Sequence, residues 1–215
     1  MPASSDIAAD SGASTRPVPA THTRTAAPTQ RRVASLALAG LFTAVIAVCS
    51  WVTVPIPWSP VPLTLQTLAV LAAGGLLGRV WGPVSVSVYI LLGIAGLPVF
   101  AGGEAGIGVV LGFKGGYLVG FVAAALVMGL AGDYVRSRRP ARRTRIAILA
   151  VAAFAASLII YALGVPWLAA VTGMGAWAAI SAGALPYLAL DALKAVAAVV
   201  VIIGVDEALS VQGLR

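Results

Sequence analysis

One carboxylate and one ammonium group stand inside a long apolar run, "LPYLALDALKAVAAVVV", at Asp191 and Lys194. A spacing of three residues puts both side chains on one face of a helix. A charged residue at the centre of a membrane helix costs roughly 2.5 to 3.5 kcal/mol, so such residues usually face a partner or a polar site. Two interpretations stay open: an ion pair that neutralises itself within the helix, or a pair that faces a polar ligand. In the second, Asp191 accepts from N–H groups and Lys194 donates to a carbonyl or carboxylate oxygen.

A second polar segment, "LPVFAGGEAGIGVVLGFKGGY", holds seven glycines together with Glu104 and Lys114. Glycines at every fourth position from Gly108 to Gly120 fit close helix packing, and glycine also lets a backbone approach a ligand. We expect both. The opposite charges of Glu104 and Lys114 predict an ion pair across the segment, contributing ~0.5 kcal/mol if exposed. A phosphate-binding loop is excluded, because the spacing is wrong and no hydroxyl follows the lysine.

The remaining polar candidate is Gln66, in "VPLTLQT", which either bonds a neighbouring helix or contacts a ligand. The chain holds one histidine, His22, and one cysteine, Cys49, which exclude a cysteine metal cluster and most histidine-based catalysis. No nucleophile–base pair, carboxylate dyad or ATPase signature is present. The sequence therefore predicts neither an enzyme nor a metal or cofactor site, and any ATP-driven transport needs ATP hydrolysis by another subunit.

The elements that position these residues are predicted to be membrane helices. Of the 215 residues 60% are hydrophobic and 10% charged, against roughly 25% charged in soluble domains. Apolar runs of about the length that spans a bilayer recur along the chain, which predicts an all-α, polytopic membrane protein. The six expected helices are 33–50, 63–78, 82–97, 116–130, 146–163 and 186–204. We expect a disordered cytoplasmic arm at 1–30, a six-helix membrane domain at 31–205 and a short cytoplasmic tail at 206–215.

Sidedness follows from the arginines, which gather in the N-terminal arm, at Arg79, in the run 136–145 and at Arg215. The positive-inside rule assigns these places, and both termini, to the cytoplasm. The proline-rich stretch after residue 50, the glycine-rich segment and residues 164–185 then share the outer face, so we expect a site that opens outward. The net charge of +7 is explained by this distribution, and nucleic-acid binding is not expected.

Four blocks in this order resemble the BioY family, the biotin-specific S-components of energy-coupling-factor (ECF) transporters. They are "VPLTLQTLAVLAAGGLLG", "GLPVFAGGEAGIGVVLG", "GGYLVGF" and "LPYLALDALKA", and the resemblance covers residues 33–204. It implies a six-helix S-component fold in the bacterial plasma membrane that captures biotin outside the cell. The implied partners are a transmembrane coupling subunit and two cytoplasmic ATPase subunits, with biotin as the transported ligand rather than a cofactor.

The resemblance also implies roles for single residues. Asp191 and Lys194 match the family's D-x-x-K motif in the last helix, which contributes to the biotin site. Gly40 and Ala44 hold the place of a small-xxx-small face that packs on the coupling subunit. An apolar wall is expected from Trp51, Trp58 or Tyr117. The candidate substrate-binding residues are Asp191, Lys194, Gly102, Gly103, Glu104, Gly106, Tyr117 and Gln66.

The glycine-rich segment matches the family's binding loop at Gly102, Gly103 and Gly106. It departs from the family at Glu104 and Lys114, where relatives commonly carry uncharged residues. Leu118 also stands where some relatives carry an arginine.

Three alternatives to this function stay open. The chain could be a stand-alone secondary carrier for biotin, or an S-component for another small vitamin. A membrane enzyme or assembly factor ranks last, because the sequence offers no catalytic constellation.

Overall fold

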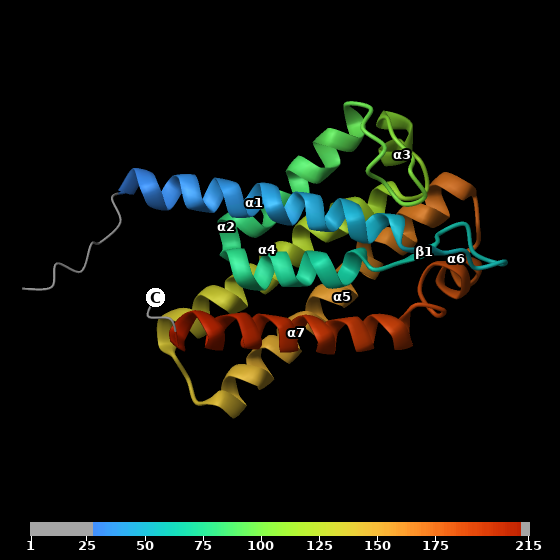
Figure 1. Cartoon of the computed structure of the whole chain (residues 1–215). Coiled ribbons are helices and arrows are strands. Elements are labelled where there is room, and N and C mark those ends of the chain that lie inside the picture. The colour runs from blue at the N-terminus through green and yellow to red at the C-terminus, as the bar shows by residue number, and fades with distance from the viewer. Residues whose placement is uncertain (1–27, 212–215) are drawn as a thin grey trace, which may run out of the picture.

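A computed structural model describes residues 28–211. Nearly all of the predicted arm at 1–30 lies outside these described residues, as does the end of the predicted tail. The described elements are α1 (Pro28–Trp51), β1 (Thr53–Val54), β2 (Leu63–Thr64), α2 (Gln66–Ile94), α3 (Ile107–Leu111), α4 (Gly115–Arg138), α5 (Arg142–Thr172), α6 (Ala176–Gly183) and α7 (Leu188–Val211). The long helices form a bundle (Figure 1).

Helix α2 folds back on itself at Gly78, which has φ 83° and ψ −178°. The amide nitrogen of Gln66 lies 2.6 Å from the Tyr89 hydroxyl oxygen, whereas 23 residues of straight helix would extend about 34 Å. Residues 66–77 and 79–94 are therefore two antiparallel half-helices (Figure 1). They correspond to the two helices predicted at 63–78 and 82–97.

Within residues 28–211, five helices are long and apolar enough to cross a membrane, with α2 counted as one of them. The predicted helical, multi-pass membrane architecture is confirmed at this level. The prediction of six spans depends on the two halves of α2. Each half is shorter than the about 20 residues that cross a bilayer core.

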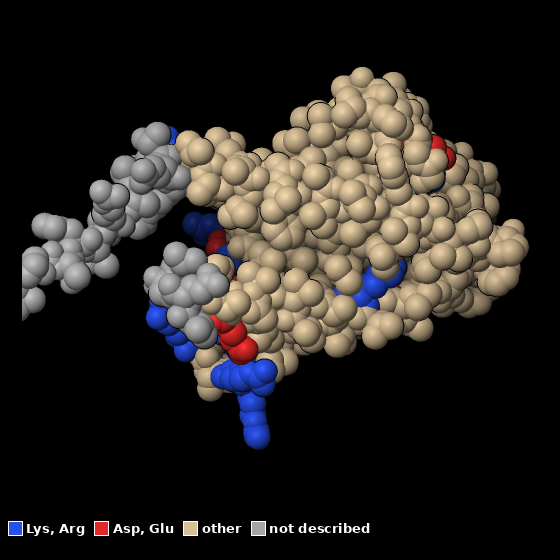
Figure 2. Space-filling model, in the orientation of Figure 1, with Lys and Arg blue, Asp and Glu red and all other residues tan. Residues whose placement is uncertain are grey.

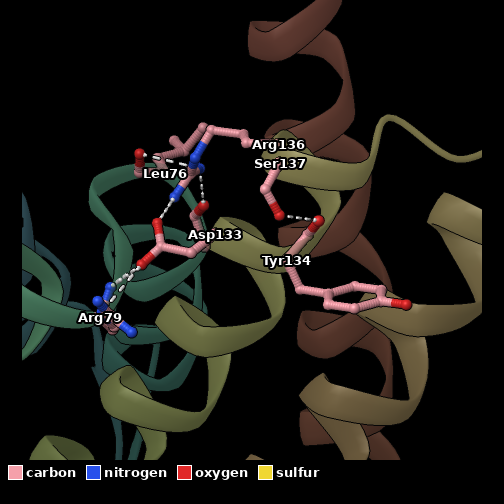
Figure 3. Close-up of polar contacts among 7 residues, drawn as sticks. Leu76, Arg79, Asp133, Tyr134, Arg136 and Ser137 are labelled. Atoms are coloured by element: carbon pink, nitrogen blue, oxygen red, sulfur yellow. Dashed lines mark hydrogen bonds and ion pairs between the residues drawn. The ribbon is translucent and has the colours of Figure 1, made fainter.

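Two charged side chains of α4 hold the fold-back of α2 (Figure 3). Arg136 donates to the carbonyl oxygens of Gly75 and Leu76 at 2.7 and 3.3 Å, which are end carbonyls of the first half-helix. Asp133 accepts from the Arg79 backbone N–H at 3.1 Å, at the start of the second half. The two side chains pair at 2.7 Å. They supply partners for backbone groups that a helix break leaves unpaired.

Several helix boundaries differ from the prediction. Helix α4 was predicted to end at residue 130, before "DYVRS", but continues to Arg138 because Asp133 and Arg136 find partners on α2. Helix α5 runs from Arg142 to Thr172 with Pro166 inside it, where a break was expected at 163; a proline removes one backbone donor without forcing the helix to end. The loops contain two further short helices, α3 and α6, which the sequence did not indicate.

Glycine allows α4 to pack closely on both of its neighbours. A Cβ at Gly116 or Gly120 would lie 2.3 Å from Trp167 Cβ or 2.9 Å from Ile160 Cα of α5. On the α2 side, a Cβ at Gly132 would lie 2.3 Å from a backbone oxygen of Gly75. Close packing is therefore confirmed for Gly116 and Gly120, whereas a Cβ at Gly108 would meet open space.

Charged side chains gather at one end of the bundle, where α4 turns into α5 and α7 ends (Figure 2). The flank of the bundle in this view is largely uncharged. Many large apolar side chains are exposed along the helices, among them Leu41, Val151 and Val200 at 57%, 70% and 64%. Such a surface suits contact with lipid.

Candidate ligand-binding site

The three segments predicted to share the outer face meet at one end of the bundle, where β1, α3 and α6 lie (Figure 1). The Ser59 and Tyr187 hydroxyl oxygens lie 2.7 Å apart and join the proline-rich stretch to the chain before α7. The Trp51 indole donates to the Pro98 carbonyl at 2.9 Å and joins that stretch to the glycine-rich segment. The Trp167 indole donates to the Gly112 carbonyl at 2.9 Å. The predicted grouping of these segments is confirmed.

Beneath them lies a narrow cavity of about 70 Å³. Its walls come from β2, both halves of α2, the glycine-rich segment, α4, α5 and α7. The polar side chains in the lining are Thr64, Gln66, Thr67, Tyr89, Lys114, Tyr117, Tyr161, Tyr187, Asp191 and Lys194.

Asp191 and Lys194 are both buried and form an ion pair of 2.8 Å. The pair also reaches other elements. The Lys194 ammonium donates to the Thr64 carbonyl at 2.6 Å, and the Tyr161 hydroxyl of α5 donates to the second carboxylate oxygen of Asp191. The two interpretations of this pair combine: it is an intrahelical ion pair and it lines the cavity. An ammonium has three donors, so Lys194 keeps one beyond these two contacts.

The flank of the molecule is hollowed between α2 and α7 (Figure 2). Figure 2 shows basic surface in a hollow between these two helices, on an otherwise uncharged part of the flank. Lys194 is the basic residue of α7, and its side chain is 8% exposed.

Gln66 makes the predicted interhelical contact and also lines the cavity. Its amide nitrogen donates to the Tyr89 hydroxyl at 2.6 Å, and its amide oxygen accepts from the Thr64 hydroxyl at 3.2 Å. Each end of the side chain thus has a partner, which fixes its orientation at the first turn of α2.

Four of the five tyrosines line the cavity: Tyr89, Tyr117, Tyr161 and Tyr187. The Tyr117 hydroxyl donates to the Gly183 carbonyl at 2.9 Å, and that of Tyr187 donates to the Val61 carbonyl. Burial raises the pKa of the Tyr187 hydroxyl above its ordinary value. Sequence reasoning singled out Tyr117 alone. An isolated tyrosine within an apolar helix is a signal that could have found the others, because a buried phenol needs a polar partner.

The apolar part of the wall includes Phe100, Val109, Leu118, Phe121 and Ile160. The expectation that Trp51 or Trp58 supplies this wall is wrong. These residues are 62% and 70% exposed and lie outside the lining, because both belong to the edge of this end of the bundle.

The glycine-rich segment lines the cavity with residues that are not glycines. Gly102, Gly103 and Gly106 have φ of 80°, 77° and 93°, which only glycine adopts without strain. They lie outside the lining, and contact between their backbone and a ligand stays a prediction. The turns they allow carry Phe100 and Ala101 into the wall.

Glu104 and Lys114 form the predicted ion pair, at 2.7 Å. The Lys114 ammonium also lies 3.4 Å from the Ala101 carbonyl oxygen and lines the cavity. Glu104 is half exposed and lies outside the lining. The ion pair therefore joins two parts of the glycine-rich segment and holds the Lys114 ammonium at the cavity.

Gly40 and Ala44 lie on an exposed face of α1 and do not line this cavity. With Thr43, Ala47 and the second half of α2, at Leu92, they line a shallow apolar depression of about 380 Å³. A Cβ at Gly40 would meet open space. This face of α1 is free for close approach by another helix.

The arrangement suits reversible binding of a small amphipathic molecule. Asp191 offers an acceptor, Lys194 and Lys114 offer donors, and phenol and amide groups surround an apolar wall. Ligand sites commonly combine a mainly apolar lining with a few fixed polar groups.

Comparison with known proteins gives consistent matches. The model of the BioY family matches residues 20–211. The chain is 37% identical to the biotin transporter BioY of Thermotoga maritima over 76% of this chain and 90% of that protein. It is 36% identical to a probable biotin transporter BioY of Pyrococcus horikoshii over 77% and 92%. Among solved structures, the S-component for biotin from an ECF-type ABC transporter superposes with a TM-score of 0.74 at 26% identity, covering 85% of this chain and 95% of that one.

Proposed function

Because the chain belongs to the BioY family, we propose that it is the biotin-binding membrane subunit of an ECF-type importer. The relatives are named as transporters, and the chain is not an enzyme. The observation that carries the proposal is the Asp191–Lys194 pair, which lines a cavity closed by the three outer segments.

The chemistry of biotin matches this cavity. Its ureido group has two N–H donors and one carbonyl acceptor, its thiolane ring is apolar, and its tail ends in a carboxylate. Asp191 accepts from a ureido N–H, and Lys194 donates its remaining hydrogen to a ligand oxygen. The aromatic and aliphatic wall at Phe100, Phe121 and Ile160 covers the ring.

The other candidate residues surround this core. Gln66 and Tyr117 complete the polar lining. Each side chain contacts the ligand through the donor or acceptor sites that its hydrogen bond to the protein does not use. Gly102, Gly103 and Gly106 present backbone groups when the ligand is bound. Glu104 acts through Lys114, whose ammonium it holds at the cavity.

Biotin titration of purified protein tests the site. Asp191→Asn and Lys194→Ala each leave a buried charge without its counter-charge, a cost of roughly 2–5 kcal/mol, so affinity falls about 30-fold or more. Glu207→Gln is the matched control, because Glu207 lies on the same helix but outside the cavity. Gel filtration checks folding. Near wild-type affinity in both site variants would mean that the pair is structural and that biotin binds elsewhere.

Competition separates biotin from other small vitamins. Unlabelled biotin is expected to displace labelled biotin, whereas thiamine and riboflavin at the same concentration are not. Displacement by either of them would assign the cavity to a different vitamin.

Uptake measurements separate an importer subunit from a stand-alone carrier. We infer that the chain delivers biotin with a transmembrane coupling subunit and two ATPase subunits. The site faces the outside and both termini face the cytoplasm. Cells that hold the chain with these partners are expected to accumulate biotin in an ATP-dependent manner. Equal accumulation without ATPase subunits would favour the secondary carrier.

A further inference from the structure

A second apolar depression runs along the flank of the bundle between α5 and α7. This α5–α7 groove has a volume of about 530 Å³. Its rim carries Phe154, Val196 and Val200, which are 65%, 61% and 64% exposed, and its floor includes the buried Ala153 and Val199. It meets the biotin cavity only at its far end, where Tyr161 and Asp191 line both spaces.

The inner half of the α5–α7 groove has the length of one lipid leaflet. From Val196 to Glu207 the helix α7 advances eleven residues, about 17 Å, and half of a bilayer core is about 15 Å. This half is lined by apolar or small residues until it reaches the charged end. At Gly204 a Cβ would meet open space, so the groove stays open at its inner end.

The inner end of the groove carries excess positive charge. Arg142 and Glu207 both line it, with the Arg142 Nε lying 3.2 Å from a Glu207 carboxylate oxygen. Arg145 shares the same oxygen at 3.4 Å, so one carboxylate faces two guanidinium groups. The neighbouring Arg143 is exposed. Figure 2 shows this mixture of mainly basic side chains at the end of the bundle.

An amphiphile with an anionic headgroup and an apolar chain fits this combination of charge and shape. The positive-inside rule explains why arginines lie on this side of the membrane but not why they stand at the mouth of an apolar groove. Guanidinium groups bind phosphate through paired hydrogen bonds. Basic pockets between membrane helices on the cytoplasmic side are suited to anionic lipid headgroups.

We propose that the α5–α7 groove binds an anionic phospholipid of the leaflet at the arginine-rich end. Its phosphate lies at Arg142 and Arg143, and one acyl chain fills the groove up to about Val196. The bound lipid packs on α5 and α7, the two helices that carry Tyr161 and Asp191.

Lipid titration in detergent tests this site, with phosphatidylglycerol as the anionic probe and phosphatidylcholine as the neutral one. Native mass spectrometry counts bound lipids, and the thermal unfolding temperature reports their effect on stability. Phosphatidylglycerol is expected to bind more tightly and to raise the unfolding temperature more than phosphatidylcholine. Arg142→Ala is expected to lower its apparent affinity about fivefold, since one arginine near the surface is worth about 1 kcal/mol.

Two further variants make the test specific. Ala150→Phe fills the groove without changing charge and is expected to displace the acyl chain and abolish the lipid-dependent rise in unfolding temperature. Arg79→Ala removes a charge at the same end of the bundle but outside the groove, and is expected to bind the lipid as the wild type does.

Three results would overturn the proposal. Equal binding of the two lipids would remove the role of the arginines. Unchanged phosphatidylglycerol binding in both Arg142→Ala and Ala150→Phe would place the lipid elsewhere. A dimer mass that Ala150→Phe converts to a monomer would show that a second copy of the chain fills the groove instead.

Discussion

At the scale of single residues, the ion pair at Asp191 and Lys194 joins three elements. Lys194 binds the end of β2 through the Thr64 carbonyl, and Asp191 binds α5 through Tyr161. A ligand bound at this pair would therefore act on elements that are already connected. Tyr161 is a positioning residue, since its hydroxyl holds one carboxylate oxygen while the other faces Lys194.

Removing the Tyr161 hydroxyl is expected to weaken biotin binding without unfolding the protein. In Tyr161→Phe the carboxylate of Asp191 loses one donor, and hydrogen bonds to charged groups contribute about 1.5–3 kcal/mol. Part of that loss appears in binding, and we expect about a fivefold lower affinity by titration. Tyr134→Phe is the control, because Tyr134 is exposed and lies outside the cavity. Wild-type affinity in Tyr161→Phe would contradict the positioning role.

Asp191, Lys194 and Gln66 were predictable from the sequence, because each interrupts an apolar run where an unpaired polar group is costly. The phenols of Tyr89 and Tyr161 could be suspected, because a buried phenol needs a polar partner, but the partner that each one finds is visible only in three dimensions. Gly102 and Gly103 show the opposite limit. The conformational freedom of these glycines was evident from the sequence. That they shape turns outside the cavity lining depends on the path of the backbone, which the sequence does not reveal.

At the scale of elements, the fold-back of α2 rests on the contacts of α4. The break at Gly78 could be placed approximately from "GGLLGRVWGP", since the predicted helices ended and began on either side of it. The reach of α4 to Arg138 could not, because charged residues near a helix end normally indicate solvent. Asp133 and Arg136 instead bind backbone groups of α2, which only the packing of the two helices reveals.

Loss of the Arg136 side chain is expected to destabilise the α2 fold-back. Arg136→Ala removes the donor to the Gly75 carbonyl and the closer of the two arginines beside Asp133, at a cost of about 2–3 kcal/mol in the free energy of unfolding. Thermal unfolding in detergent measures the change. The control is Arg138→Ala, an exposed arginine two residues further along α4. A drop in unfolding temperature no larger than that of the control would show that the contacts are dispensable.

A bulky side chain on the exposed face of α1 is expected to block transport but not binding. The small residues Gly40 and Ala44 allow close approach of another helix, so Ala44→Trp should abolish ATP-dependent uptake with its partners while biotin titration stays normal. Leu41→Trp is the control, because Leu41 is exposed but lies outside the depression at Gly40. Normal uptake by Ala44→Trp would mean that the coupling subunit docks elsewhere.

At the scale of the whole molecule, the arginine clusters and the cavity lie at opposite ends of the bundle. The arginine clusters surround the turn between α4 and α5, and the cavity lies under the segments that carry β1, α3 and α6 (Figure 1). This separation was predictable, because loop charge and loop composition are local properties of the sequence. The meeting of the three outer segments was expected only as a shared face; contacts such as Ser59 with Tyr187 required the fold.

Cysteine labelling tests the orientation of the molecule. In a Cys49→Ala background, an impermeant thiol reagent is expected to label Ala105→Cys in intact cells, because that residue is exposed beside the cavity end of the bundle. Pro140→Cys, between α4 and α5, is expected to react only after the membrane is opened. Labelling of position 140 in intact cells would reverse the sidedness and with it the proposed capture of biotin from outside.

The fold-back of α2 also has a consequence for the surrounding bilayer. Its second half, residues 79–94, exposes Val80, Val84, Val88 and Leu91 on the flank, yet its sixteen residues extend only about 24 Å. The hydrocarbon core is about 30 Å thick. A mismatch of about 6 Å is met by local thinning of the membrane or by headgroups and water drawn inward. We therefore expect an asymmetric annulus of lipid around the protein, thinner beside the second half of α2 and of ordinary thickness beside the 31-residue helix α5.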